Sequence, residues 1–228
     1  MHVQDKPLSQ YPLWLKPFFW SQKRRYGEVL KPGLLWARVP KLFAAVAALY
    51  GVLDRKRSPI NPVLRSLITV RVSQINHCAF CVDINAATLV RRAGSQDKID
   101  HLSDWQHSDR FDDVERTVLA YTEAMTYSDR EVTPQLMGQL KAIYDDDAVV
   151  ELTALIAFQN LSSKFNSALD VAAQGFCTVP AVVDQIQAIH QTEQAVDPAV
   201  GEVADQVPEE LSAECDSSSS NSVAPSIK

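Results

Sequence analysis

Residues 71–85 read RVSQINHCAFCVDIN, and only two residues separate the cysteines Cys78 and Cys81. In a helix, side chains three residues apart are neighbours, with Cβ atoms about 5–6 Å apart. A small adjustment brings such a pair within the ~3.5–4.5 Å that a disulfide requires. We expect a helix from about Cys78 to Ala93 that stops at Gly94, because glycine readily takes the left-handed cap conformation. The unpaired N–H groups at the start of this helix would favour a thiolate, so the spacing predicts a redox-active pair.

Three interpretations of the pair compete with a redox role: a zinc site, two inert cysteines and a permanent disulfide. A structural zinc site needs two more ligands at matching spacing, and the remaining cysteines, Cys177 and Cys215, stand alone in the sequence. Two inert buried cysteines are compatible with the pattern, because a free cysteine packs as a small hydrophobe. A permanent disulfide would constrain only a very short loop and is disfavoured in a reducing compartment. A thioredoxin-like site is not indicated, because no βαβ pattern surrounds the pair.

Helix start and stop signals recur along the chain and predict an all-α fold. Only seven glycines are present, and no turn-bounded alternating strands stand out. We expect a helix to start where a capping residue precedes a proline, where an acidic capping box occurs, and at two further prolines. The predicted helices are residues 41–53 after Pro40, a helix opening at Asn61-Pro62, residues 112–127 with the capping box Asp112–Glu115, a helix opening at Thr133-Pro134, a long helix capped by Asp146 or Asp147 that ends near Gln174-Gly175, and Pro180 to about His190.

The first of these helices is strongly apolar, and we expect Leu42, Ala45, Leu49 and Leu53 to form its core-facing stripe. The uncharged run from Leu42 to Leu53 is shorter than the ~20 residues that a membrane span requires. Charged residues near the start interrupt any apolar signal-peptide core. The sequence therefore predicts a cytoplasmic protein.

The net charge of −6 is unevenly distributed. Residues 191–228 hold eight acids and one lysine, a net charge of −7, so residues 1–190 are nearly neutral at +1. A neutral body gives no general electrostatic case for nucleic-acid binding. The acidic, serine-rich end lacks aromatic residues, which predicts a disordered tail over residues 191–228. We expect a single helical domain over residues 26–190.

The first 25 residues are an arm rich in aromatic and basic side chains. Tyr11 to Trp20 contains five aromatic residues, and Lys23-Arg24-Arg25 follows. Such a segment could touch a membrane surface or an anionic partner. Prolines interrupt any long amphipathic helix there, which favours packing of the aromatics on the same domain or on a neighbouring subunit.

The stretch from about Pro59 to Ala124 resembles the carboxymuconolactone decarboxylase family, in particular its alkylhydroperoxidase D-like branch. The likeness rests on these residues: Leu64-Arg65, Val70–Asn76, Cys78-Ala-Phe-Cys81-Val-Asp83, Ala93-Gly94, Glu115-Arg116 and Ala120–Ala124. It extends more loosely through Phe158–Asn160 to Gly175. The resemblance implies an all-α fold assembled as a homo-oligomer (dimer, trimer or hexamer). It also implies reduction of hydroperoxides or disulfides by the two cysteines, with no cofactor or metal and with an external dithiol as reductant.

Two positions depart from the pattern of that branch, in which a glutamate and a histidine form a proton relay. Ser66 stands twelve residues before the first cysteine in place of the glutamate, and Asn85 stands four residues after the second in place of the histidine. Neither can shuttle protons near neutral pH. Asn85 lies one helical turn from Cys81 and could orient the thiolate. We hypothesise that His77, four residues before Cys81, serves as the base if the helix begins early enough for the two to share a face.

The sequence is compatible with either cysteine as the attacking residue. The resemblance assigns the peroxide attack to Cys81 and the resolving role to Cys78, whereas helix electrostatics favour Cys78 as the more acidic thiol. The predicted function is a thiol-dependent peroxidase or disulfide oxidoreductase, slowed by the missing relay because acid–base help contributes roughly 10²–10⁴-fold. The alternatives are a redox-sensing or scaffold protein of the same family and, less favoured by the dithiol, a lactone decarboxylase.

Overall fold

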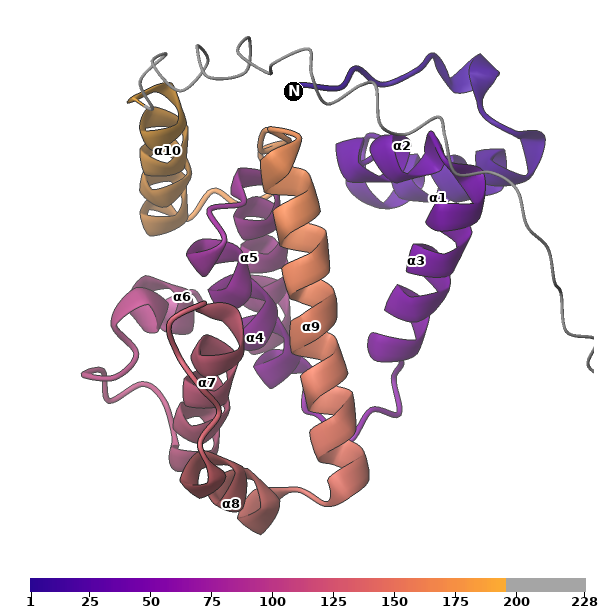
Figure 1. Ribbon diagram of the computed structural model, residues 1–228. Helices are drawn as coiled ribbons and strands as arrows, with labels where there is room; N and C mark the ends of the chain where they lie inside the picture. Colours follow the sequence, from indigo (N-terminus) through magenta and orange to yellow (C-terminus); the bar gives the residue numbers. More distant parts are fainter. Residues whose placement is uncertain (196–228) are drawn as a thin grey trace, which may run out of the picture. The chain divides into compact units, whose positions relative to one another are not determined.

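The computed structural model describes residues 1–195, and in this range every regular element is helical. Short 3₁₀ turns occur at Leu8–Gln10, Leu13–Leu15 and Leu102–Asp104. The α-helices are α1 (Lys16–Tyr26), α2 (Lys31–Ala37), α3 (Pro40–Leu53), α4 (Pro62–Ile75), α5 (Ala79–Ala93), α6 (Asp97–His101), α7 (Asp113–Thr126), α8 (Pro134–Ile143), α9 (Asp146–Ala168) and α10 (Pro180–Ala195) (Figure 1). The predicted all-α fold is confirmed. No helix of the described residues is long and apolar enough to cross a membrane.

The predicted helix starts are the most accurate part of the sequence reading. The Asn61 side chain accepts a hydrogen bond from the Val63 amide at the start of α4. Asp112 and Glu115 form the expected capping box of α7, and the Thr133 side chain caps α8. Each of these caps is a contact between residues two or three positions apart, so the local sequence determines it.

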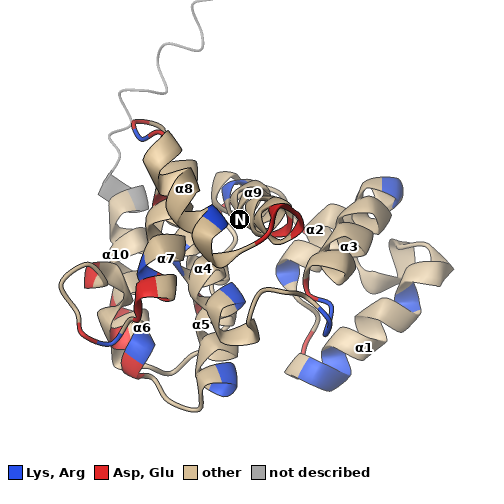
Figure 2. Cartoon of the chain, turned by 90° about the horizontal axis from the view of Figure 1, so that it is seen from below, with Lys and Arg blue, Asp and Glu red and all other residues tan. Residues whose placement is uncertain are grey.

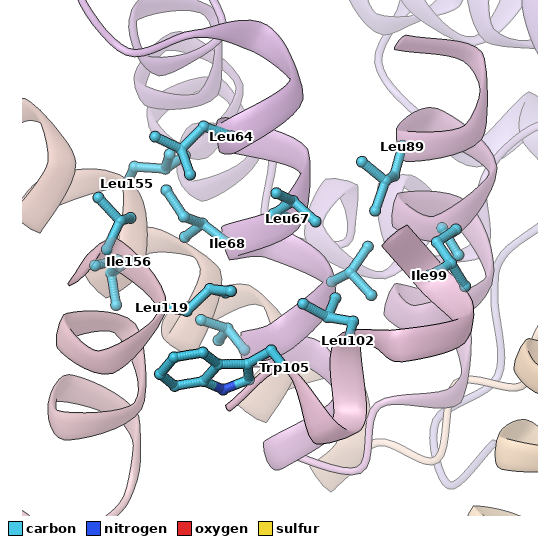
Figure 3. Close-up of a cluster of buried hydrophobic side chains, with 14 of the residues drawn as sticks. Leu64, Leu67, Ile68, Leu89, Ile99, Leu102, Trp105, Leu119, Leu155 and Ile156 are labelled. Atoms are coloured by element: carbon cyan, nitrogen blue, oxygen red, sulfur yellow. The ribbon is translucent and has the colours of Figure 1, made fainter. Parts of the chain in front are cut away.

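Helix α4 lies at the centre of the main core, packed between α5, α7 and α9 (Figure 1). Its core side chains include Leu64, Leu67 and Ile68, which meet Leu119 of α7 and Ile156 of α9 (Figure 3). Leu67 and Ile68 have no exposed surface. Because α4 is buried on several sides, it forms a fixed support for the start of α5.

The amino-terminal arm belongs to the same compact unit, residues 1–191. Tyr11, Leu15 and Phe19 are buried against Trp36 of α2 and Phe43 of α3 in a second apolar cluster. These residues therefore pack within the chain, which the sequence favoured over contact with a membrane surface or an anionic partner. Other arm residues remain exposed, including Leu13, Trp14 and Trp20.

The predicted core stripe of α3 is wrong for three of its four residues. Leu53 is buried, whereas Leu42, Ala45 and Leu49 face outward. The inward face of the helix is built from Phe43 and Val46 instead. Almost every residue of α3 is apolar, so the sequence pattern carried too little contrast to define which face is buried.

The predicted carboxyl end of the long helix is also wrong. Helix α9 ends at Ala168, about six residues before Gln174. Its cap is Asp145 and not Asp146 or Asp147 as predicted, because it is the Asp145 side chain that accepts from the Ala148 amide. Asp170 then adopts a left-handed conformation, with φ 51°. The backbone amides of Gln174 and Gly175 donate to the buried carboxylate of Asp83 rather than to helix carbonyls. The helix itself ends in a local turn, in which the Asp170 amide donates to the Ser167 carbonyl and the Val171 amide donates to the Asn166 carbonyl.

The last helix and the tail differ slightly from the predicted boundary. Helix α10 starts at Pro180 as expected and reaches Ala195, five residues beyond the predicted end at His190. The predicted disordered tail, residues 191–228, lies outside the described residues from residue 196 onward, and Cys215 lies there too.

Candidate active site

The two cysteines form a disulfide at the start of α5, with Cα atoms 5.2 Å apart. Cys78 is the N-cap residue of the helix, and its Sγ accepts a hydrogen bond from the Cys81 amide at 3.2 Å. Cys81 lies in the first turn. Both side chains are almost fully buried. The helix start therefore places one backbone donor on the Cys78 sulfur, as expected for a cysteine at a capping position.

The second sulfur has a side-chain donor from another helix. The Asn166 Nδ2 of α9 lies 3.2 Å from the Cys81 Sγ, and Asn166 is 1% exposed. Its Oδ1 is buried and has no hydrogen-bond partner among the described residues. The Cys78 sulfur is thus contacted by a backbone N–H donor, and the Cys81 sulfur is contacted by a side-chain N–H donor.

Asn85 lies one turn after Cys81 as predicted, and its amide donates to Ser73 rather than to a sulfur. The distance from the Asn85 Nδ2 to the Ser73 Oγ is 3.1 Å. Gln159 of α9 donates to the same hydroxyl at 3.0 Å. The Ser73 hydroxyl in turn donates to the Thr69 carbonyl at 2.6 Å. Ser73 therefore joins α4, α5 and α9 beside the dithiol.

Ser66, the second departure from the relay, lies in a polar cluster with two charged residues. Its Oγ accepts from Arg92 of α5 at 3.0 Å and donates to the Pro62 carbonyl. Arg92 also forms an ion pair with Asp54 at 2.8 Å. A hydroxyl held by an arginine can position a polar ligand atom, but it has no proton that titrates near neutral pH.

His77 does not meet the geometric condition for the base hypothesis. It lies in the turn between α4 and α5, is exposed, and adopts a left-handed conformation with φ 50°. Helix α5 begins only at Ala79, after the cap at Cys78, so His77 and Cys81 do not share a helical face. His101 and His107 are exposed as well.

Asp83 fixes the segment after α9 against the start of α5. Its carboxylate is fully buried and accepts backbone hydrogen bonds from Gln174, Gly175 and Cys177 at 2.7–2.8 Å. Burial raises the pKa of the Cys177 thiol, and the nearby Asp83 adds to this effect against a backbone hydrogen bond from Val179. Cys177 is therefore a protonated packing residue.

A cavity of about 350 Å³ lies beside Cys81. Helices α4, α5 and α9 contribute polar side chains to its lining, including Ser66, Asn85 and Asn166. Helices α2 and α3 contribute mainly apolar side chains, including Trp36 and Phe43, and α1 contributes both kinds. Cys81 lines this cavity, whereas Cys78 and His77 are not among its lining residues. The arrangement gives a small organic molecule access to one sulfur of the pair.

The sequence reading missed the contribution of α9 to this site. Gln159, Ser162 and Asn166 all line the cavity and follow one another at spacings of three and four residues. This polar stripe on a largely apolar helix is a signal that could have been found by its periodicity. No group of three or more metal-ligating side chains occurs among residues 1–195.

The chain is similar to known proteins in both sequence and fold. The profile of the carboxymuconolactone decarboxylase family matches residues 40–124. The uncharacterized protein YnjA of Escherichia coli K12 is 47% identical over 174 residues, which cover 76% of this chain and 96% of YnjA. The alkylhydroperoxidase AhpD core structure of a peroxidase-related protein from Ralstonia eutropha JMP134 superposes with a TM-score of 0.67 at 21% identity, covering 73% and 88% of the two chains. The debrominase Bmp8 in complex with 2,3,4-tribromopyrrole superposes with a TM-score of 0.67 at 22% identity, covering 83% and 97%.

The helical fold is that of the AhpD-like structures. The chain belongs to the carboxymuconolactone decarboxylase family.

Proposed function

We propose that this protein is a thiol-dependent oxidoreductase that reduces organic hydroperoxides or disulfides through Cys78 and Cys81. The observation that supports the proposal best is the disulfide whose Cys81 lines a cavity at the start of α5. Membership of a family with AhpD-like, peroxidase-related structural neighbours agrees with it. The apolar side chains that α2 and α3 contribute to the cavity favour an organic substrate over hydrogen peroxide.

The proposed reaction balances as a two-electron reduction. The Cys81 thiolate attacks the outer oxygen of the hydroperoxide, the O–O bond breaks, and the alcohol leaves after taking a proton. Cys81 is then a sulfenic acid, which the Cys78 thiolate attacks to form the disulfide and release water. An external dithiol reduces the disulfide by exchange and returns both cysteines to the thiol form.

Counting free thiols tests this proposal directly. The fully reduced protein is treated with cumene hydroperoxide, and free thiols per chain are measured before and after. We expect a loss of two thiols that a dithiol reverses. Cys78→Ser and Cys81→Ser should each prevent disulfide formation, whereas Cys177→Ser, the matched control, should still lose two thiols.

Thiols that stay free under peroxide would overturn the proposal. That outcome would favour the scaffold alternative, in which the fold is kept and peroxide turnover is absent. Because Ser66 and Asn85 supply no proton relay, we expect turnover to be slow compared with relatives that carry one, by as much as about 10²–10⁴-fold.

A second candidate function is reductive dehalogenation of a small aromatic ring. The aromatic side chains of the cavity wall, among them Trp36, Phe43 and Phe80, favour a flat ring beside Cys81. The Cys81 thiolate would take the halogen as the carbon–halogen bond breaks, and the ring carbon would take a proton. Cys78 would then displace halide and form the disulfide. Bromide release from 2,3,4-tribromopyrrole, the ligand of the Bmp8 structure, would support this candidate, and its absence would exclude it for that substrate.

A further inference from the structure

Asn166 stands out because it reaches the dithiol from a part of the chain 85 residues away. It lies near the end of α9, its side chain is 1% exposed, and its Nδ2 is 3.2 Å from the Cys81 Sγ. Its backbone carbonyl accepts from the Val171 amide at 3.0 Å, which fixes the turn after the helix. Both Asn166 and Cys81 line the cavity. The amide is therefore held beside the one sulfur that a substrate can reach.

Because the amide nitrogen is a hydrogen-bond donor, the strength of this contact depends on the redox state of Cys81. The Asn166 nitrogen is a donor only, so it favours the sulfur with the most electron density. A disulfide sulfur is a weak acceptor, whereas a thiolate or a sulfenate is a strong one. Asn166 and Cys81 are 1% and 2% exposed, so the contact lies in a region of low dielectric constant, where a hydrogen bond to a charged sulfur is stronger than in water. The same hydrogen bond therefore strengthens when the disulfide is reduced.

The other end of the same amide argues against a purely structural role. The Asn166 Oδ1 is buried and accepts no hydrogen bond from the described residues. A packing asparagine is expected to satisfy both of its polar atoms. Here the nitrogen contacts Cys81, and the oxygen remains available to a proton on the sulfur, on a sulfenic acid or on a ligand.

We propose that Asn166 is a positioning residue that stabilises the thiolate of Cys81 and thereby makes Cys81 the attacking sulfur. The competing donor is the Cys81 backbone amide, which contacts the Cys78 Sγ at 3.2 Å and favours Cys78. The Asn166 contact offsets that preference, and the cavity exposes only Cys81 to substrate. This inference rests on the proposed redox function of the pair.

The pH dependence of alkylation tests the assignment. In a Cys78→Ser background, iodoacetamide labelling of Cys81 is followed by peptide mass spectrometry from pH 5 to 10. Asn166→Leu removes the donor at similar volume and should move the labelling midpoint upward by about one pH unit, the effect of losing a hydrogen bond to a charged group. Asn166→Asp places a negative charge beside the sulfur and should move the midpoint further in the same direction.

Asn160→Leu is the matched control, because Asn160 is on the same helix but does not line the cavity. Its midpoint should match that of the background protein. Circular dichroism identifies a variant that fails to fold, and the nearly isosteric Asn166→Asp keeps the test available if Asn166→Leu does. Unchanged midpoints in folded Asn166→Leu and Asn166→Asp would overturn the assignment.

The labelling experiment requires no turnover, so its result is separate from the proposed function. A shifted midpoint without any loss of thiols under hydroperoxide would support the role of Asn166 and overturn the peroxidase proposal. Normal thiol loss with unchanged midpoints would support the peroxidase proposal and overturn the role of Asn166.

Discussion

Glu123 is a buried carboxylate that three side chains from separate parts of the chain contact. Its Oε1 accepts from Trp105 Nε1 at 2.8 Å and from Arg71 of α4, and its Oε2 accepts from Arg130. Burial by itself would raise the pKa of this carboxyl group. The hydrogen bond from Trp105, with the charge and hydrogen bonds of Arg71 and the hydrogen bond from Arg130, lowers the pKa below its ordinary value instead.

Glu123→Gln should destabilise the protein at neutral pH by about 3 kcal/mol, because it leaves the largely buried Arg71 without its counter-charge. The measurement is the free energy of unfolding in urea at pH 7. Glu131→Gln is the control, since Glu131 is an exposed acid close by, and we expect a change within about 0.5 kcal/mol. Equal effects of the two variants would contradict the role given to Glu123.

The same carboxylate predicts a pH dependence with a definite sign. A group whose pKa is lower in the folded state stabilises the fold fully above its unfolded pKa, about 4.3 for glutamate. That contribution is lost as the pH falls from there through the folded pKa. The stability gap between wild type and Glu123→Gln should therefore be constant near neutral pH and shrink progressively below about pH 4.3. A gap that widens on acidification would show that the carboxylate is not stabilised by its partners.

At the level of helices, Ser73 joins the three elements that carry the site. Its hydroxyl accepts from Asn85 of α5 and Gln159 of α9 and donates within α4. Ser73→Ala would leave the buried Gln159 amide without this acceptor, at a cost of about 1–3 kcal/mol. Thr117→Ala is the control, because the Thr117 hydroxyl makes a similar bond within α7 but is exposed. Urea unfolding should show a loss for Ser73→Ala alone; equal losses would mean that the contact between helices contributes little.

The helices also show which features a sequence alone can predict. Asn61, Asp112 and Thr133 marked the helix starts correctly because each caps an amide two or three residues away. The end of α9 was wrong because the helix stops in a turn whose left-handed position is occupied by Asp170, so no glycine marks this stop in the sequence.

The residues of the candidate site likewise differ in whether the sequence alone predicts their roles. Cys78 and Cys81 were evident because they are close in sequence and sit at a helix start. The contact of Asn166 with Cys81 depends on how α9 packs against α5, which no local pattern specifies. His77 illustrates the converse, because its predicted role required a helix that begins earlier than α5 does.

For the molecule as a whole, the outer face of α3 is the most notable feature left without a partner among the described residues. Leu42, Leu49 and Val52 are 43%, 43% and 58% exposed and lie along one helix. The only charged residue of α3 is Lys41, at one end of the helix (Figure 2). Exposed Trp20 of α1 adds to the apolar surface of this unit. An apolar surface of this kind is typical of a protein–protein interface.

We therefore expect the chain to form a homo-oligomer through the outer face of α3. A self-associating face requires no charge complementarity, which suits a surface with almost no charge. Light scattering after size exclusion should give a mass that is a multiple of the 25.3 kDa chain. The double variant Leu49→Glu with Val52→Glu should lower that mass, because a buried interface would have to desolvate two carboxylates. Val132→Glu, on the loop before α8, is the control and should leave the mass unchanged. A wild-type protein that runs as a monomer would contradict the prediction, and an unchanged oligomer in the double variant would place the interface on another face.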